Sequence, residues 1–175
     1  MQSASEVLRQ RFGFGEFRPG QEAVISHLLA GKSAAAVFPT GSGKSLCYQL
    51  PALLLPGLTV VVSPLVALMK DQVDAAREQG LPAAFLNSTL ETGDAAAVYR
   101  ELAAGGIKLL YISPERFRIP GFAEKLKAFG ACFFAVDEAH CLSEWGHDFR
   151  PDYLELSGIR RLFPEARIAG FTATA

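Results

Sequence analysis

Short apolar runs alternate along the chain with longer segments in which apolar residues recur at helical spacing. The run TVVV at 59–62 is typical of a strand that is buried on both faces of a sheet. Other strands are predicted at 83–86, 108–112, 132–136 and 167–171, and one that ends at Val37-Phe38. Helices are predicted from Ser3 to about Phe12, up to Gly31, directly after Ser45, from Pro64 to Ala76, and at 94–103.

This alternation of strands and helices predicts an α/β fold built from βαβ units. Such units give a parallel β-sheet with helices on both faces. Ligands of these folds bind beyond the carboxyl ends of the strands, so polar residues that follow directly after a predicted strand are the candidates for chemistry.

Composition limits the classes of protein that remain. Half of the 175 residues are hydrophobic, enough to bury the core of a single domain over residues 1–175. With 17 basic against 18 acidic residues, the net charge is −1. Binding to nucleic acid would therefore depend on a local patch and not on overall charge.

The cysteines and the N-terminus indicate the compartment. Cys47, Cys132 and Cys141 contain no CxxC pair, which is typical of reduced, unpaired thiols. The first residues hold no apolar signal core, and no run reaches the length of a transmembrane helix. We expect a soluble protein, cytoplasmic in a bacterium or nuclear in a eukaryote, with no membrane partner.

The stretch FPTGSGKSLCYQLP at 38–51 places glycines, a lysine and hydroxyls between a predicted strand and a predicted helix. Glycines allow backbone amides to converge on an anion, and the helix adds the positive end of its dipole. The candidate phosphate-binding residues are Thr40, Gly41, Ser42, Gly43, Lys44 and Ser45. Lys44 suits phosphate oxygens, and Ser45 suits Mg²⁺. Because Phe38 replaces the first glycine of G-x-x-x-x-G-K-[ST], a glycine-rich turn with an exposed lysine is the alternative.

The stretch VDEAH at 136–140 follows another predicted strand. Adjacent carboxylates at the end of a buried strand repel each other unless a cation or water network uses them. Asp137 suits Mg²⁺, and Glu138 suits a general base that orients an attacking water. A solvated acidic loop is the alternative. Together with the lysine loop, the pair predicts the two halves of one site for ATP and Mg²⁺.

Five motifs resemble, in order, those of superfamily 2 helicases: FRPGQ at 17–21, PTGSGKS at 39–45, SPLVALMKDQV at 63–73, DEAH at 137–140 and TAT at 172–174. The stretch HCLSEWGHDFRPDY at 140–153 resembles the aromatic-rich loop of RecQ-family DNA helicases. The resemblance covers nearly the whole chain. It implies a RecA-like P-loop NTPase domain, the first motor lobe of an ATP-dependent 3′-to-5′ DNA helicase acting in repair and recombination.

The resemblance also implies roles for single residues. Gln21 would read the adenine edge, and Arg18 and Phe14 would pack on the base; a core position is the alternative for Phe14. His140, Thr172 and Thr174 would couple the ATP site to DNA. Single-stranded DNA would contact residues of three segments: Ser63 and Pro64, Ser113 and Arg116, and Trp145, Phe149 and Arg150 of the aromatic-rich loop.

Several alternatives stay open at this stage. The aromatic side chains of the loop would instead pack on the domain itself if they serve only structure. Zinc at His140, Cys141 and His147 is disfavoured, because a fourth ligand and the usual spacing are missing. The family's second RecA-like lobe supplies an arginine finger that this chain lacks, so we expect weak hydrolysis by the chain alone. An RNA-directed ATPase and a non-enzymatic nucleotide-binding module are the alternative functions.

Overall fold

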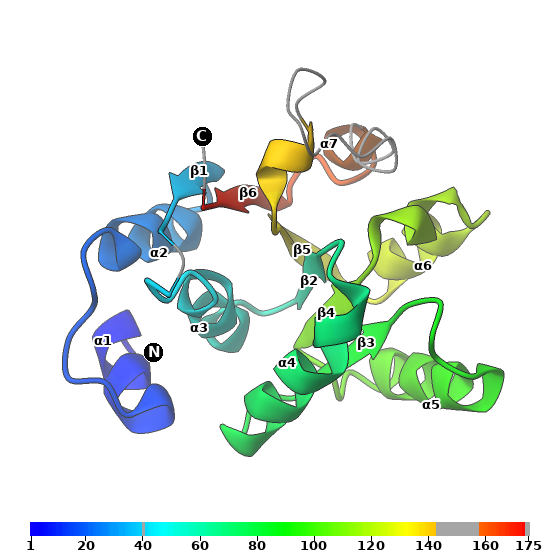
Figure 1. Ribbon diagram of the computed structural model, residues 1–175, viewed down its shortest axis with the longest axis horizontal. Helices are drawn as coiled ribbons and strands as arrows, with labels where there is room; N and C mark the ends of the chain where they lie inside the picture. Colours follow the sequence, from blue (N-terminus) through cyan, green and yellow to red (C-terminus); the bar gives the residue numbers. More distant parts are fainter. Residues whose placement is uncertain (40, 143–157, 174–175) are drawn as a thin grey trace.

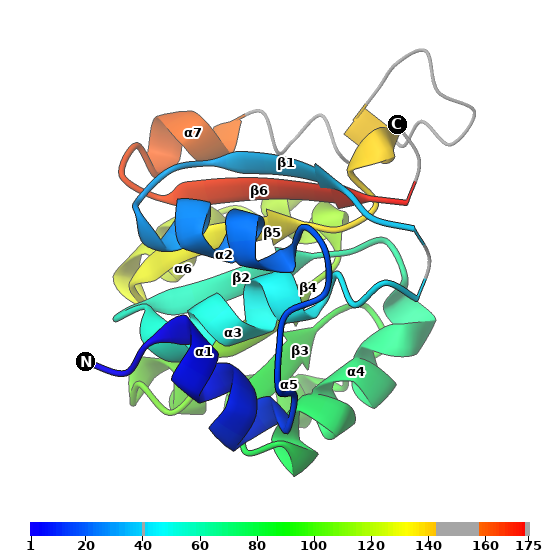
Figure 2. The same ribbon diagram turned by 90° about the vertical axis from the view of Figure 1, so that its left-hand side faces the viewer.

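Six parallel strands form one sheet in the order β1-β6-β5-β2-β4-β3 (Figure 2). The computed structural model describes residues 1–39, 41–142 and 158–173. The strands are β1 (Ala34–Val37), β2 (Leu58–Val62), β3 (Ala83–Leu86), β4 (Leu109–Ile112), β5 (Ala131–Val136) and β6 (Arg167–Thr172). The predicted α/β fold with a parallel sheet is confirmed.

Helices connect the strands. The α-helices are α1 (Ala4–Val7), α2 (Gln21–Leu29), α3 (Leu46–Leu54), α4 (Val66–Glu78), α5 (Thr92–Ala103), α6 (Phe122–Ala128) and α7 (Ile159–Leu162). A π-helix, η1 (Leu8–Phe12), continues α1, and two 3₁₀ turns follow strands, η2 (Pro114–Arg118) and η3 (Ala139–Leu142).

The sheet separates two hydrophobic cores, and side chains alternate between them along each strand. In β4, Leu109 and Tyr111 belong to the core under α2, α3 and α4, whereas Leu110 and Ile112 belong to the core under α5, α6 and α7. Figure 1 shows the two groups of helices on opposite sides of the sheet. The buried faces of β2 explain why the run at 59–62 is apolar apart from Thr59.

The N-terminal helix departs from the prediction in one respect. The capping box of Ser3 and Glu6 begins it as expected, with Ser3 N donating to Glu6 Oε2 at 2.7 Å and Glu6 N donating to Ser3 Oγ at 3.2 Å. After Val7 the helix widens into η1, which ends at Gly13 in the left-handed region at φ 74°. An apolar pattern does not distinguish the two helix types, and π-helical turns are frequent at functional sites.

Several of the described motifs follow or end strands at one edge of this sheet. The phosphate-binding stretch follows β1, Ser63 follows β2, Ser113 follows β4, Asp137 follows β5, and Thr172 ends β6. Because β6 lies between β1 and β5, Thr172 is positioned between the lysine loop and the acidic motif.

Candidate nucleotide-binding site

The loop between β1 and α3 has the backbone of an anion-binding turn. Gly41 and Gly43 have φ angles of 79° and 80°. Residues that carry a Cβ atom strongly disfavour this part of the φ/ψ map. A Cβ atom at Gly43 would lie 2.7 Å from Nε2 of Gln21, so any other residue here would displace the Gln21 amide. Ser45 is the N-cap of α3, but its side chain makes no capping hydrogen bond, which leaves its hydroxyl free for a ligand.

Residues 13–21, which we call the N-terminal strap, hold this loop from outside. Gln21 is buried, and its Oε1 accepts a hydrogen bond from the Arg18 amide at 2.8 Å. Its Nε2 donates to the Gly43 carbonyl at 2.9 Å, and the Arg18 guanidinium donates to the Gly41 carbonyl at 2.9 Å. The two residues expected to bind adenine therefore also fix two carbonyls of the phosphate-binding loop.

A cavity of about 190 Å³ lies between the strap and α3. Phe14 and Arg18 line one side, and Ser45 and Gln49 line the other. The Phe14 ring is 49% exposed, so it is not the core aromatic that the alternative required. The structure brings together Phe14, Arg18 and Gln21, as expected of a base pocket, and their contact with adenine stays a prediction.

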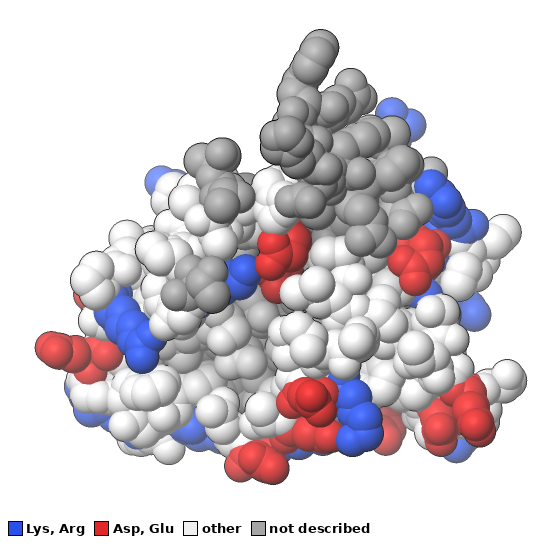
Figure 3. Space-filling view, viewed as in Figure 1, with Lys and Arg blue, Asp and Glu red and all other residues white. Residues whose placement is uncertain are grey.

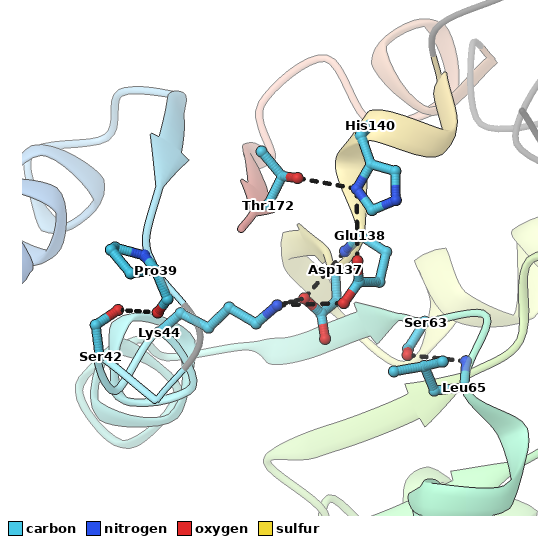
Figure 4. A network of polar contacts seen from close by, with 9 residues as sticks. All are labelled: Pro39, Ser42, Lys44, Ser63, Leu65, Asp137, Glu138, His140 and Thr172. Atoms are coloured by element: carbon cyan, nitrogen blue, oxygen red, sulfur yellow. Dashed lines mark hydrogen bonds and ion pairs between the residues drawn. The ribbon is translucent and has the colours of Figure 1, made fainter. Parts of the chain in front are cut away.

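Lys44 connects the two motifs (Figure 4). Its ammonium lies 2.9 Å from Asp137 Oδ1 and 3.4 Å from Glu138 Oε1. Burial alone would lower the pKa of Lys44, but the hydrogen bonds that its ammonium donates to Asp137 and Glu138, together with the two carboxylate charges, raise that pKa above its ordinary value. The contact spans residues 94 positions apart, so the fold itself joins the lysine loop to the acidic motif.

Glu138 has an unusual backbone. It is the one non-glycine residue among those described with a positive φ, 54°. The Asp137 carboxylate accepts a hydrogen bond from the Glu138 amide at 3.0 Å. His140 Nδ1 lies 2.9 Å from Thr172 Oγ1 and 3.4 Å from Glu138 Oε2 (Figure 4). A strained backbone held by several partners is typical of a functional site, where it fixes the direction of one side chain, here the Glu138 carboxylate.

The residues expected to contact DNA differ in their surroundings. Ser63 is buried, and its hydroxyl accepts a hydrogen bond from the Leu65 amide at 3.2 Å. Ser113 is fully buried. Arg116 donates to the Tyr99 hydroxyl at 3.0 Å, and its guanidinium lies 5.2 Å from the centre of the Phe122 ring. Both serines are buried, so a DNA contact here would use the backbone that follows them.

Five of the expected site residues lie outside the described part of the chain. They are Thr40, Trp145, Phe149, Arg150 and Thr174. Pro64 is described and opens the segment before α4, next to Leu65, whose side chain is 40% exposed.

Metal binding depends on how the potential donor side chains are arranged. Within the described residues, no group of three or more His, Cys, Asp and Glu side chains is arranged to hold a metal ion. A Mg²⁺ ion bound with a nucleotide needs less from the protein, because phosphate oxygens and waters complete its shell. The buried Asp137 carboxylate and the uncommitted Ser45 hydroxyl fit that demand. The described part of the chain also contains no helix with the length and apolar character needed to span a membrane.

Sequence reasoning missed one group of residues beneath the site. Tyr48 of α3 and Tyr111 of β4 are almost fully buried, and Gln49 donates to the Tyr111 hydroxyl at 3.5 Å. The signal for them was a polar residue, Gln49, among apolar neighbours in the helix that follows the phosphate-binding loop.

Comparisons with known proteins agree with this geometry. Residues 18–175 match the family model "DEAD/DEAH box helicase". The chain is 50% identical over 99% of its length to "ATP-dependent DNA helicase RecQ" of Haemophilus influenzae, and 48% identical over 99% to the protein of the same name from Pasteurella multocida. It spans 28% of the length of each of these two relatives.

Solved structures show the same fold. The crystal structure of the DUF1998 helicase MrfA superposes with a TM-score of 0.77 at 18% identity, over 99% of this chain and 29% of that one. The fold, the lysine loop joined to the acidic motif, and the family match lead to one conclusion. This chain belongs to the DEAD/DEAH box helicase family, and along nearly its whole length it is similar to the RecQ-type members.

Proposed function

We propose that the chain is the ATP-binding first motor lobe of a RecQ-type ATP-dependent DNA helicase. The observation that carries this proposal is the contact of Lys44 with both Asp137 and Glu138. It joins a phosphate-binding loop to a pair of carboxylates, which is the arrangement needed to hold a nucleotide triphosphate and direct a water molecule at it. The relatives named as ATP-dependent DNA helicases support the same activity.

Each residue of the site then has a separate task. The backbone amides around Gly41 and Gly43 and the ammonium of Lys44 bind the phosphates. Glu138 accepts the proton of the attacking water, and the His140 imidazole, bonded to Thr172, limits the rotation of the Glu138 carboxylate. Gln21, Arg18 and Phe14 bind the base.

Ser45 and Asp137 would hold the Mg²⁺ ion that accompanies ATP. Bound there, the ion would neutralise phosphate charge and favour departure of the γ-phosphate. When the nucleotide binds, Lys44 exchanges its contact with the carboxylates for one with phosphate oxygens. The ion pair of Lys44 with Asp137 and Glu138 therefore belongs to the nucleotide-free protein.

Hydrolysis coupled to DNA requires more than this lobe. A second RecA-like lobe, supplied by the rest of a longer protein, would add the cation that the γ-phosphate lacks here. Single-stranded DNA would lie along the carboxyl edge of the sheet, and movement would run 3′ to 5′, unwinding duplex DNA. The protein would work where DNA is, in the cytoplasm or the nucleus.

Magnesium-dependent ATP binding by calorimetry tests the proposal. Lys44→Ala should abolish measurable binding, while circular dichroism should show a folded protein. Lys70 is the matched control, since it forms an exposed ion pair with Asp74 at 2.7 Å on α4. Lys70→Ala should bind ATP like the parent chain, because such surface pairs contribute little. Unchanged affinity in Lys44→Ala would overturn the assignment.

A further inference from the structure

Gln49 lies where a ligand in the base cavity would meet α3. Ser45 and Gln49 are four residues apart in one helix, so they share a face, and both line the cavity together with Phe14 and Arg18. Tyr48 and Leu50, which flank Gln49, are buried in the core, and Gln49 itself is half-buried. The amide group therefore stands at the boundary between the cavity and the core.

Tyr111 holds this amide from the core side. Gln49 Nε2 donates to the Tyr111 hydroxyl at 3.5 Å. The Tyr111 ring packs edge-on against Tyr48, with centroids 6.3 Å apart, and Tyr48 packs edge-on against Phe171 at 5.7 Å. Rings packed in this way leave the hydroxyl little freedom to move, so its position is set by the core.

The Tyr111 hydroxyl is not needed to fill space. A phenylalanine would pack the same ring volume, and burying a hydroxyl destabilises the fold when it is left unpaired. Burial also raises the pKa of Tyr111, so the group stays a neutral hydroxyl. The hydroxyl is hydrogen-bonded to two side chains, Gln49 and Tyr48. Its contact with Gln49 fixes the direction of the Gln49 amide.

This arrangement leaves the other end of the Gln49 amide for a ligand. Among the described residues, none donates a hydrogen bond to its Oε1. The amide of Gln21, by contrast, is engaged at both ends by the chain, at Arg18 and at Gly43. Gln49 of α3 thus offers the cavity an amide oxygen that no residue in the described part of the chain uses.

We infer that Gln49 is a base-recognition residue of the nucleotide pocket and that Tyr111 is its positioning residue. The inference rests on the proposed ATP-binding function. An acceptor oxygen at this point pairs with the exocyclic amino group of adenine, whereas guanine presents a carbonyl oxygen there, which an acceptor repels. Gln49 thereby favours ATP over GTP.

Calorimetry with three magnesium-bound probes tests this: ATP, GTP, and inorganic tripolyphosphate, which has no base. Gln49→Ala should bind ATP about fivefold more weakly, the loss expected for one hydrogen bond. Its preference for ATP over GTP should shrink by a similar factor, and its tripolyphosphate affinity should equal that of the parent chain. Gln10→Ala, a change of an exposed glutamine outside the cavity, is the control and should alter none of these.

Tyr111→Phe should reproduce the effect of Gln49→Ala on ATP without changing tripolyphosphate binding. Adding it to Gln49→Ala should cause no further loss, because a positioning residue acts only through the residue it positions. Equal losses for ATP and tripolyphosphate would mean a structural role and overturn the inference. An unchanged ATP-to-GTP ratio in Gln49→Ala would also overturn it, as would a parent chain with no base preference. A parent chain that binds neither ATP nor tripolyphosphate overturns the proposed function itself, and the inference with it.

Discussion

At the scale of single residues, the site is organised by charges that compensate one another. Asp137 is buried and would be costly as an isolated carboxylate, yet Lys44 lies within hydrogen-bonding distance of it. Lys44 therefore stabilises the fold, in addition to its proposed role in binding phosphate. A substitution there has two consequences, on binding and on stability, and the two respond differently to pH.

The stabilising effect of Lys44 should disappear at high pH. Its pKa in the folded protein is raised above the ordinary value of 10.5, so its contribution is complete below that value and is lost as the pH rises through the raised pKa. Urea unfolding of the parent and of Lys44→Met should therefore differ at pH 8, with the parent more stable, and converge toward pH 11 and above. A difference that persisted unchanged over this range would show that the charge of Lys44 does not stabilise the fold.

Glu138 allows the binding and chemical steps to be separated. Glu138→Gln keeps the shape and the contact with His140 but cannot take a proton. ATP affinity should remain near that of the parent, and hydrolysis should fall by about 10²-fold or more. Single-turnover measurements in a protein of the relatives' full length provide the rate. Turnover near the parent value would assign the water to another residue.

At the scale of elements, the strap connects the proposed base pocket to the phosphate-binding loop. Gln21 bonds to the carbonyl of Gly43, and Arg18 bonds to that of Gly41, so two hydrogen bonds join residues 13–21 to the phosphate-binding loop. The Gln21 Nε2 group has a second N–H, so a base can engage Gln21 while the first N–H stays on the Gly43 carbonyl.

Gln21→Ala should therefore weaken two things at once. ATP should lose its advantage over GTP, as expected for a base-reading amide. Tripolyphosphate should also bind more weakly, because the loop loses the bond that holds Gly43, and this second loss separates Gln21 from Gln49. Calorimetry with both probes measures it. If only the base preference changed, the Gln21 bond to the loop would have no effect on phosphate binding.

Local signals predicted much of this architecture. The strand expected at 83–86 coincides with β3, and β2, β4, β5 and β6 begin or end within one residue of their predicted bounds. The phosphate-binding loop and the acidic motif were also recognisable, because glycine spacing and adjacent carboxylates are legible in a few consecutive residues. Helix α6 was missed because it has seven residues and buries only Phe122 and Leu126, too few to establish a period.

The contacts that complete the site could not be predicted from the sequence in this way. Gln21 meets Gly43 across 22 positions, and Gln49 meets Tyr111 across 62. Both contacts depend on how helices pack on the sheet, which no local pattern encodes. The buried hydroxyls of Ser63 and Ser113 have the same cause, since their motif indicated a ligand but not the direction of the side chain.

At the scale of the molecule, charge is distributed without a dominant sign. Figure 3 shows basic and acidic side chains interspersed on the face viewed, in line with the net charge of −1. Attraction of DNA by this lobe alone should therefore be weak. The chain spans 28% of the length of its Haemophilus relative.

The order of the strands has a consequence for folding during synthesis on the ribosome. In the sheet, β1 pairs with β6, with Ala34 opposite Ala169. The first strand to be synthesised therefore waits for the last one before it can join the sheet, and pairings this distant in sequence form slowly. Until β6 has been synthesised, β1 is unpaired, so the phosphate-binding loop that follows β1 has no fixed starting point. A chain shortened to residues 1–158 should bind no ATP and should be cut by protease within residues 34–45, whereas ATP binding by that fragment would mean that the loop is built before the sheet is closed.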